Sequence, residues 1–306
     1  MFFSVVYFQI GSPTESSRWI YEAKNIKLRI SDSIDKPKLI VVAGSNGLFG
    51  ISCHLIQKET KFPCINGSTI VALQIDYMLD LARRLSSEED IVLLALEYET
   101  YKYSGQVSSV LVDYVFAREP DYISSQNLIR KIRLFGGMSL DRIAQGIIAK
   151  YKPLTKSKYG YQSNSINDYG DETNNRAADL TEYDRQKIAG EKPLKSLLEG
   201  GYFTSTTGMN IIEEFVDWCR QNNIKVIATW PNTIWFEEYI SLETEKYFQS
   251  IKDFYQSIDV PILGEPRDFM YDPSLFYDTI YHLNDRGTRR RTQKLIELLL
   301  PYLDKL

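Results

Sequence analysis

The chain has 306 residues, of which 43% are apolar and 25% charged, and its formal net charge is −4. These proportions are ordinary for a folded globular protein and argue against a disordered chain. The acidic balance offers no electrostatic surface for nucleic acid, which requires an excess of lysine and arginine. The length suits one large domain, or one domain that carries an insertion.

The first ten residues, MFFSVVYFQI, are strongly apolar but have about half the length of a membrane-spanning helix. They lack the basic region and the small-residue cleavage site of a signal peptide. Two interpretations stay open for this run, a buried strand or the remnant of a membrane anchor. We therefore treat residues 1–36 as an N-terminal segment and residues 37–306 as the folded domain.

The first firm element is a strand at 38–43, where five apolar residues in succession indicate burial on both faces. A Gly-Ser-Asn-Gly turn follows, and then a predicted helix over 48–59. Ser45 is thereby placed on a tight turn between a strand and a helix, where free backbone N–H groups can hold an anion. Its structural alternative is ordinary turn chemistry.

Strands and helices then alternate along the chain. Further strands are predicted at 62–66, 91–96, 225–229 and 260–263. Helices are predicted at 70–85, 123–151, 211–222, 242–257 and 285–303. This alternation predicts a three-layer α/β/α, doubly wound, flavodoxin-like fold with a mostly parallel sheet.

A polar insertion at about 152–207 interrupts the alternation, and it shows little periodicity. Segments of this length without regular structure are usually functional or disordered. Its tyrosines argue against full disorder; they are Tyr159, Tyr161, Tyr169, Tyr183 and Tyr202. Its acidic residues, Asp168, Asp171 and Glu172, could bind a cation, but a solvated loop is the favoured interpretation.

Three cysteines are present, Cys53, Cys64 and Cys219, and no pair has the CxxC spacing of a metal site. Their odd number argues against a disulfide framework, although one bridge could form. A basic run at 286–291 begins the last predicted helix, and we interpret it as a solvated helix face.

Ligands of doubly wound sheets bind at the carboxyl ends of the strands. The residues that the chain places at this edge are Ser45, Asn46, Gly67, Ser68, Glu97, Glu99 and Trp230. The two glutamates could act as paired acids or bind a metal, yet side chains two apart on a strand more often just share a face. Trp230 could stack on a sugar ring or belong to the core, with even odds.

One of the two histidines, His282, lies four residues after Asp278 in the run YDTIYHLN. An aspartate can orient a histidine that acts as the general base for a serine nucleophile, and Ser45 is the candidate for that serine. The alternative is a histidine buried by packing and bonded to a nearby carbonyl. We interpret the other histidine, His54, as structural.

Three runs, AGSNGLFGI, DIVLLALEYETY and FYDTIYHLNDRGTRRRT, resemble the SGNH, or GDSL-type, hydrolase superfamily. More narrowly, they are similar to SGNH-like proteins of the bacterial envelope that are associated with polysaccharide O-acetylation. The resemblance covers the chain from about Pro37 to its end. It implies a serine esterase or O-acyltransferase without metal or cofactor, in which Gly67 N–H and the turn amides stabilise the oxyanion.

The resemblance also implies an acylated carbohydrate as substrate and a membrane-bound O-acyltransferase as partner. The expected location is extracytoplasmic, in the periplasm or at the cell surface, with a cytoplasmic location as the alternative. The insertion at 152–207 would then shape the acceptor site.

Three departures from the superfamily pattern limit what the resemblance implies, and the first two, at Asn46 and Glu99, favour a degenerate site. Counting back from Gly50 puts Asn46 at the nucleophile position, and Glu99 replaces the asparagine that stabilises the oxyanion. Three residues, not two, separate Asp278 from His282. The main alternative is a catalytically degenerate SGNH fold that serves as a glycan-binding or accessory protein. A third hypothesis is a metal-dependent hydrolase built on Glu97, Glu99 and His282.

Overall fold

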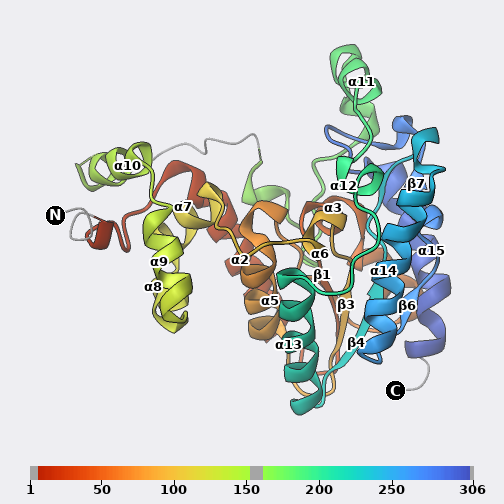
Figure 1. Ribbon diagram of the computed structural model, residues 1–306, viewed down its shortest axis with the longest axis horizontal. Helices are drawn as coiled ribbons and strands as arrows, with labels where there is room; N and C mark the ends of the chain where they lie inside the picture. The colour runs from red at the N-terminus through yellow and green to blue at the C-terminus, as the bar shows by residue number, and fades with distance from the viewer. Residues whose placement is uncertain (1–5, 152–160, 304–306) are drawn as a thin grey trace.

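The computed structural model of this chain describes residues 6–151 and 161–303, and Figure 1 shows their arrangement. A five-stranded parallel sheet lies at the centre of these residues. Its strands are β1 (Leu39–Val42), β2 (Cys64–Asn66), β3 (Ile91–Leu94), β4 (Lys225–Thr229) and β6 (Ile262–Leu263), in the spatial order β2-β1-β3-β4-β6. The order and the intervening helices confirm the predicted doubly wound α/β fold.

Helices cover both faces of the sheet because successive strand residues point to opposite sides. Ile40 and Val42 belong to the larger of two cores, whereas Leu39 and Val41 belong to the smaller. The larger core is covered by α2 (Glu15–Asp32), α5 (Gln74–Leu85), α13 (Thr207–Gln221) and α14 (Leu242–Ser257). The smaller core is covered by α4 (Cys53–Thr60) and α15 (Asp285–Leu303).

The N-terminal segment contributes a helix that the sequence analysis did not anticipate. This helix, α2, packs against α5 and α7 (Ser109–Arg118), and its Trp19 and Ile20 enter the larger core. Residues 6–14 form a helical turn followed by an irregular stretch, so the strand interpretation is wrong for these residues. Residues 1–5 lie outside the described part of the chain. No described helix combines the length and the apolar character needed to cross a membrane.

Two predicted helices are broken in the structure. The helix predicted at 48–59 is divided into α3 (Ser45–Gly50) and α4, because the backbone is extended at Ile51 and the Ser52 side chain caps α4. The helix predicted at 123–151 is divided into α8 (Pro120–Ser125), α9 (Leu128–Gly136) and α10 (Leu140–Tyr151). Asn127 caps α9, which ends at a pair of glycines.

The described part of the insertion, from residue 161 onward, forms α11 (Glu182–Ala189) and α12 (Lys195–Leu198), and Figure 1 shows α11 projecting from the body. The expectation of a solvated loop is wrong for Asp171 and Glu172, which are both buried. Asp171 accepts hydrogen bonds from the N–H groups of Cys53 and His54 at the start of α4. Its carboxylate therefore caps a helix, which explains its burial. Tyr159 lies outside the described residues.

One disulfide is present, and it joins Cys53 at the start of α4 to Cys64 in β2, with their Cα atoms 5.0 Å apart. Cys219 is a free thiol buried in the larger core. The bridge fastens the element that follows the Ser45 turn to the edge strand of the sheet.

Candidate active site

Asp278 and His282 lie on a tight loop between β7 (Met270–Tyr271) and α15. The Tyr277 N–H donates to the His282 carbonyl over 2.8 Å, and the His282 N–H donates to the Thr279 carbonyl over 3.2 Å. These bonds turn the chain back on itself, so that Asp278 Oδ1 lies 2.6 Å from His282 Nδ1. The loop thus brings the two side chains together in spite of the additional residue between them.

Tyr161, at the start of the described insertion, donates its hydroxyl to the second oxygen of Asp278 over 2.6 Å. Burial raises the pKa of Asp278, but the hydrogen bonds from His282 and Tyr161 and the charge of His282 outweigh it, leaving this pKa below its ordinary value. The carboxylate is therefore ionised at neutral pH. It fixes the proton of His282 on Nδ1 and leaves Nε2 as the free acceptor.

Phe49 connects the histidine to the helix that carries Ser45. The rings of Phe49 and His282 stack with centroids 4.2 Å apart and planes inclined by 10°. Ser45 begins the same helix, α3, and residues four apart lie on one face of a helix. Ser45 and Phe49, the residue on which the histidine stacks, therefore lie on the same side of α3. Among the described residues, neither Ser45 Oγ nor His282 Nε2 has a hydrogen-bonding partner.

The turn before α3 is held by Glu97, which follows β3 and is completely buried. Its carboxylate accepts the N–H of Gly44 over 3.0 Å and that of Asn46 over 3.1 Å. Burial raises the pKa of Glu97, and the hydrogen bonds from Asn46 and Gly44 oppose that rise. The turn amides of Gly44 and Asn46 thus have protein acceptors, whereas the first N–H of α3, that of Ser45, has none among the described residues.

The residues after β2 support α3 from the other side. The Asn66 side-chain amide donates to the carbonyls of Gly47 and Ile51 at 3.0 and 2.9 Å. The Ser68 N–H donates to Asn66 Oδ1, and the Gly67 N–H donates to the Ile65 carbonyl. The expectation that Gly67 N–H is an oxyanion donor therefore conflicts with its geometry in this structure.

Glu99 bonds to groups outside the Ser45 turn. Its exposed carboxylate accepts the Tyr281 hydroxyl over 2.7 Å and the Ser196 hydroxyl over 3.2 Å. Glu97 instead bonds to the amides of the turn, so the two glutamates share no hydrogen-bonding partner. Within residues 6–151 and 161–303, no three potential ligands from histidine, cysteine, aspartate and glutamate lie close enough together to hold a metal ion.

Arg291 of α15 links the serine turn to the histidine loop. Its Nη1 donates to the Asn46 carbonyl over 2.8 Å and to Asn232 Oδ1 over 2.6 Å. The Asn232 amide donates in turn to the carbonyl of Tyr281, the residue before His282. The expectation of a solvated basic face is wrong for Arg291, which is completely buried. Burial lowers its pKa to about 10.

The insertion adds a second link between the same two segments. The Asn175 amide donates to the Leu283 carbonyl over 2.9 Å and to the Phe49 carbonyl over 3.3 Å. Lys187 of α11 donates to the Asp278 carbonyl over 3.0 Å. The insertion was expected to shape an acceptor site, which stays a prediction; its described residues contact the segments that carry Phe49, Asp278 and Leu283.

Trp230 is a core residue. It is 1% exposed, its indole N–H donates to the Gly264 carbonyl over 2.9 Å, and its ring packs against Phe248. The suggestion that Trp230 stacks on a sugar ring is therefore wrong for this structure, and the core interpretation holds. Its backbone still serves the site, because its carbonyl accepts Arg291 Nη2 over 3.0 Å.

Sequence reasoning missed the residues that connect the candidates: Tyr161, Asn175, Asn232 and Arg291. Asn232 gave a usable signal, because it follows β4 at the ligand-binding edge of the sheet. Arg291 gave none, since its arginine-rich neighbours are exposed. A comparison of this chain with protein-family models and with curated proteins found no match.

Proposed function

We propose that this chain is an SGNH-like serine esterase or O-acyltransferase that acts on acylated carbohydrate. The observation that carries the proposal is the hydrogen-bonded pair of Asp278 and His282, stacked on the helix that Ser45 begins. A histidine oriented by an aspartate and a serine at a strand-to-helix turn are the groups that acyl transfer by a serine requires.

In the proposed reaction, Ser45 Oγ attacks the acyl carbonyl carbon while His282 Nε2 takes the hydroxyl proton. The Ser45 N–H faces the oxygen that becomes negative in the tetrahedral intermediate. His282 then returns the proton to the leaving sugar oxygen as the C–O bond breaks, which leaves an acyl-serine. Asp278 keeps its own charge and stabilises the imidazolium throughout.

Release of the acyl group repeats these steps with a second hydroxyl. Water gives hydrolysis, whereas a sugar hydroxyl gives transfer, so the two activities differ in the acceptor that reaches the acyl-serine. The carbohydrate substrate, the membrane-bound O-acyltransferase partner and the extracytoplasmic location rest on the resemblance of the sequence runs. The Cys53–Cys64 disulfide supports the location, because such bonds persist in oxidising compartments.

The second candidate function is a catalytically degenerate fold that binds glycan. It is favoured by the absence of a hydrogen bond between Ser45 and His282, and by the Glu97 carboxylate on the amides of Gly44 and Asn46. The absence of this hydrogen bond does not by itself exclude catalysis, because catalytic hydrogen bonds often form or tighten only when substrate binds.

Ester hydrolysis separates the two candidates. With p-nitrophenyl acetate, we expect Ser45→Ala to lower kcat/KM by at least about a thousandfold, because the nucleophile is lost. The matched control is Ser257→Ala, an exposed serine at the end of α14 whose hydroxyl bonds to the Phe254 carbonyl. Equal rates for Ser45→Ala and wild type would remove Ser45 from the mechanism and favour the degenerate fold.

A further inference from the structure

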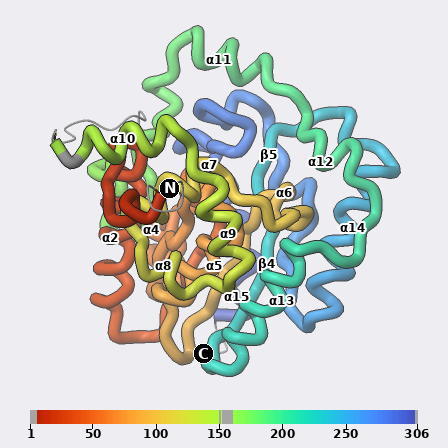
Figure 2. Tube along the Cα trace, turned by 60° about the vertical axis from the view of Figure 1, so that its left-hand side comes forward, coloured from red at the N-terminus to blue at the C-terminus, as the bar shows by residue number. Residues whose placement is uncertain are grey.

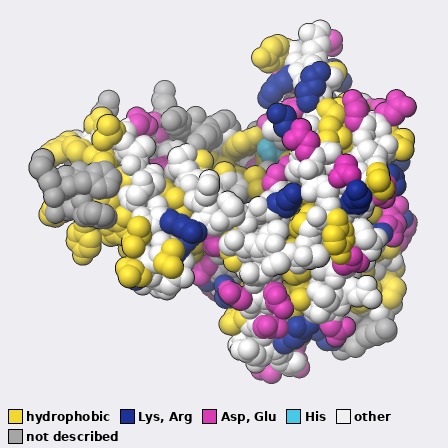
Figure 3. Space-filling view, viewed as in Figure 1, with side chains coloured by type: hydrophobic (Ala, Val, Ile, Leu, Met, Phe, Trp, Pro, Cys, Tyr) yellow, Lys and Arg dark blue, Asp and Glu magenta, His cyan; other side chains and the backbone are white. Residues whose placement is uncertain are grey.

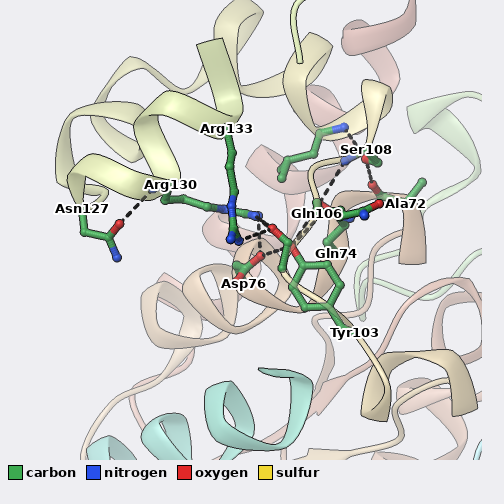
Figure 4. Close-up of polar contacts among 11 residues, drawn as sticks. Ala72, Gln74, Asp76, Tyr103, Gln106, Ser108, Asn127, Arg130 and Arg133 are labelled. Atoms are coloured by element: carbon green, nitrogen blue, oxygen red, sulfur yellow. Dashed lines mark hydrogen bonds and ion pairs between the residues drawn. The ribbon is translucent and has the colours of Figure 1, made fainter. Parts of the chain in front are cut away.

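Helix α9 buries Leu134 but exposes three other large apolar side chains. Leu128, Ile129 and Ile132 share one face and are 58–73% exposed, whereas Arg130 points inward and is buried. Arg130 forms an ion pair with Asp76 of α5, and its Nη1 donates to the Tyr103 hydroxyl over 2.8 Å (Figure 4). An amphipathic helix on a globular protein normally places these faces the other way round.

Helix α10 shows the same inversion. Leu140, Ile148 and Tyr151 lie on its outer face, and Tyr151 is 88% exposed. The inner face carries Arg142, whose Nε lies 2.9 Å from Asp113 of α7 and whose Nη2 donates to the Ser12 carbonyl over 2.7 Å. Two neighbouring helices are thus held by arginines that face inward, and both present apolar side chains to the outside.

These helices form one end of the molecule with the start of the chain. Figures 1 and 2 both show the described N-terminal residues beside α10 and α7, and Gln9 bonds to Arg142. Tyr7 and Phe8 add exposed aromatic rings there. Figure 3 shows apolar side chains gathered at this end of the molecule, away from α11. We call this group of exposed side chains the apolar end; its members are Tyr7, Phe8, Leu128, Ile129, Ile132, Leu140, Ile148 and Tyr151.

The charge of this region identifies the surface that it fits. The stretch 126–160 contains eight lysines and arginines and one acid, Asp141, in a chain whose net charge is −4. Arg130 and Arg142 are buried in ion pairs, and Arg133 donates to the Gly105 carbonyl over 2.8 Å, which leaves the five lysines of this stretch. On α9, Lys131 lies beside the exposed apolar side chains, at a position set by the helical period. Apolar side chains beside cations are typical of helices that lie in the interface of an anionic bilayer.

We propose that the apolar end docks on the surface of an anionic lipid membrane, with α9 and α10 lying in the headgroup region. The apolar side chains enter the lipid, and Lys131 binds the anionic headgroups. Docking needs no spanning segment, in keeping with the absence of one among the described residues. This inference is independent of the proposed acyl chemistry.

Vesicle co-sedimentation of the full chain tests the proposal. We expect wild type to pellet with vesicles of phosphatidylglycerol and phosphatidylcholine far more than with phosphatidylcholine alone, and added salt to weaken the binding. The double variant Leu128→Gln, Ile132→Gln should lower the partition coefficient about tenfold for each side chain. Both side chains are exposed, so the circular dichroism and the melting temperature should be those of wild type.

The control is Ile240→Gln, Leu242→Gln, which changes an equally exposed apolar pair outside the apolar end. It should bind vesicles as wild type does, whereas Lys131→Glu should weaken binding to anionic vesicles. The proposal is overturned if wild type does not bind anionic vesicles. It is also overturned if the control variant binds these vesicles as weakly as the α9 variant does. Sedimentation velocity that shows a dimer abolished by the α9 variant, without vesicle binding, would assign the surface to a second copy.

Discussion

Asp278 is the residue on which the orientation of the histidine depends, and its ionisation can be measured through stability. The pKa of Asp278 is held below its ordinary value of 3.8 in the folded chain, mainly by its bonds to His282 and Tyr161 working against burial. A lowered folded-state pKa stabilises the folded chain above the unfolded pKa, and this contribution disappears as pH falls through the folded value.

We therefore expect the unfolding free energy of Asp278→Asn to fall less steeply than that of wild type between about pH 5 and pH 2. Urea denaturation at a series of pH values measures this difference. Asp121→Asn, an exposed carboxylate of α8, should follow the wild-type curve. Parallel curves for Asp278→Asn and wild type would show that Asp278 is not held in its charged form.

Lys27 is a second titrating residue near the site, buried where its Nζ bonds to the carbonyls of Asn66 and Gly170. Burial lowers its pKa from 10.5 to about 7, against the nearby charges of Asp171 and Glu172. Between these values the unfolded chain binds more protons than the folded chain. The contribution of Lys27 to the free energy of unfolding must therefore rise with pH between about pH 7 and pH 10.5.

The variant Lys27→Met lacks this titration. The unfolding free energy of wild type relative to Lys27→Met should rise from pH 7 to about pH 10, by up to about 1.4 kcal/mol for each pH unit. Lys58→Met, on the surface of α4, is the matched control. A difference that stays constant with pH would mean that Lys27 keeps an ordinary pKa.

The candidate site depends on how helix α3 is positioned against the loop before α15. Arg291 and Asn232 form one link between them, and Asn175 forms another. If these links position the serine against the histidine, weakening one should slow the chemical step more than it weakens substrate binding.

We expect Arg291→Met to lower kcat for ester hydrolysis by at least about tenfold with little change in KM, because the Asn46 carbonyl and the Asn232 amide lose their shared partner. Arg289→Met changes an exposed arginine of the same helix and should leave both constants unchanged. Circular dichroism separates a positioning effect from unfolding. Unchanged kcat in folded Arg291→Met would contradict the positioning role.

The elements also show which parts of the structure could be predicted from the sequence. Continuous apolar strands and their alternation with helices identified the sheet, because burial on both faces leaves a clear pattern. The aspartate and histidine were found because they are close in sequence. Tyr161 and Arg291 were not, since their partners lie 117 and 245 residues away and no local pattern records such contacts. The inward arginines of α9 and α10 are likewise explained by tertiary ion pairs.

Across the whole molecule, the carboxyl edge of the sheet and the apolar end differ in the kind of side chain that they gather. The carboxyl edge of the sheet gathers buried polar groups that hold Ser45 and His282, whereas the apolar end exposes side chains that a soluble surface would avoid. We propose acyl chemistry for the first surface and docking on lipid for the second. Each proposal can fail without the other, because vesicle binding needs no nucleophile and ester hydrolysis needs no membrane.

If His282 activates Ser45, a fluorophosphonate should capture that serine covalently. Intact mass and peptide mapping should show a single adduct on Ser45 in wild type, strongly reduced in His282→Asn and absent in Ser45→Ala. A chain that forms no adduct, or forms it on another residue, would contradict the account. An adduct on Ser45 that is equally fast in His282→Asn would contradict the role given to the histidine.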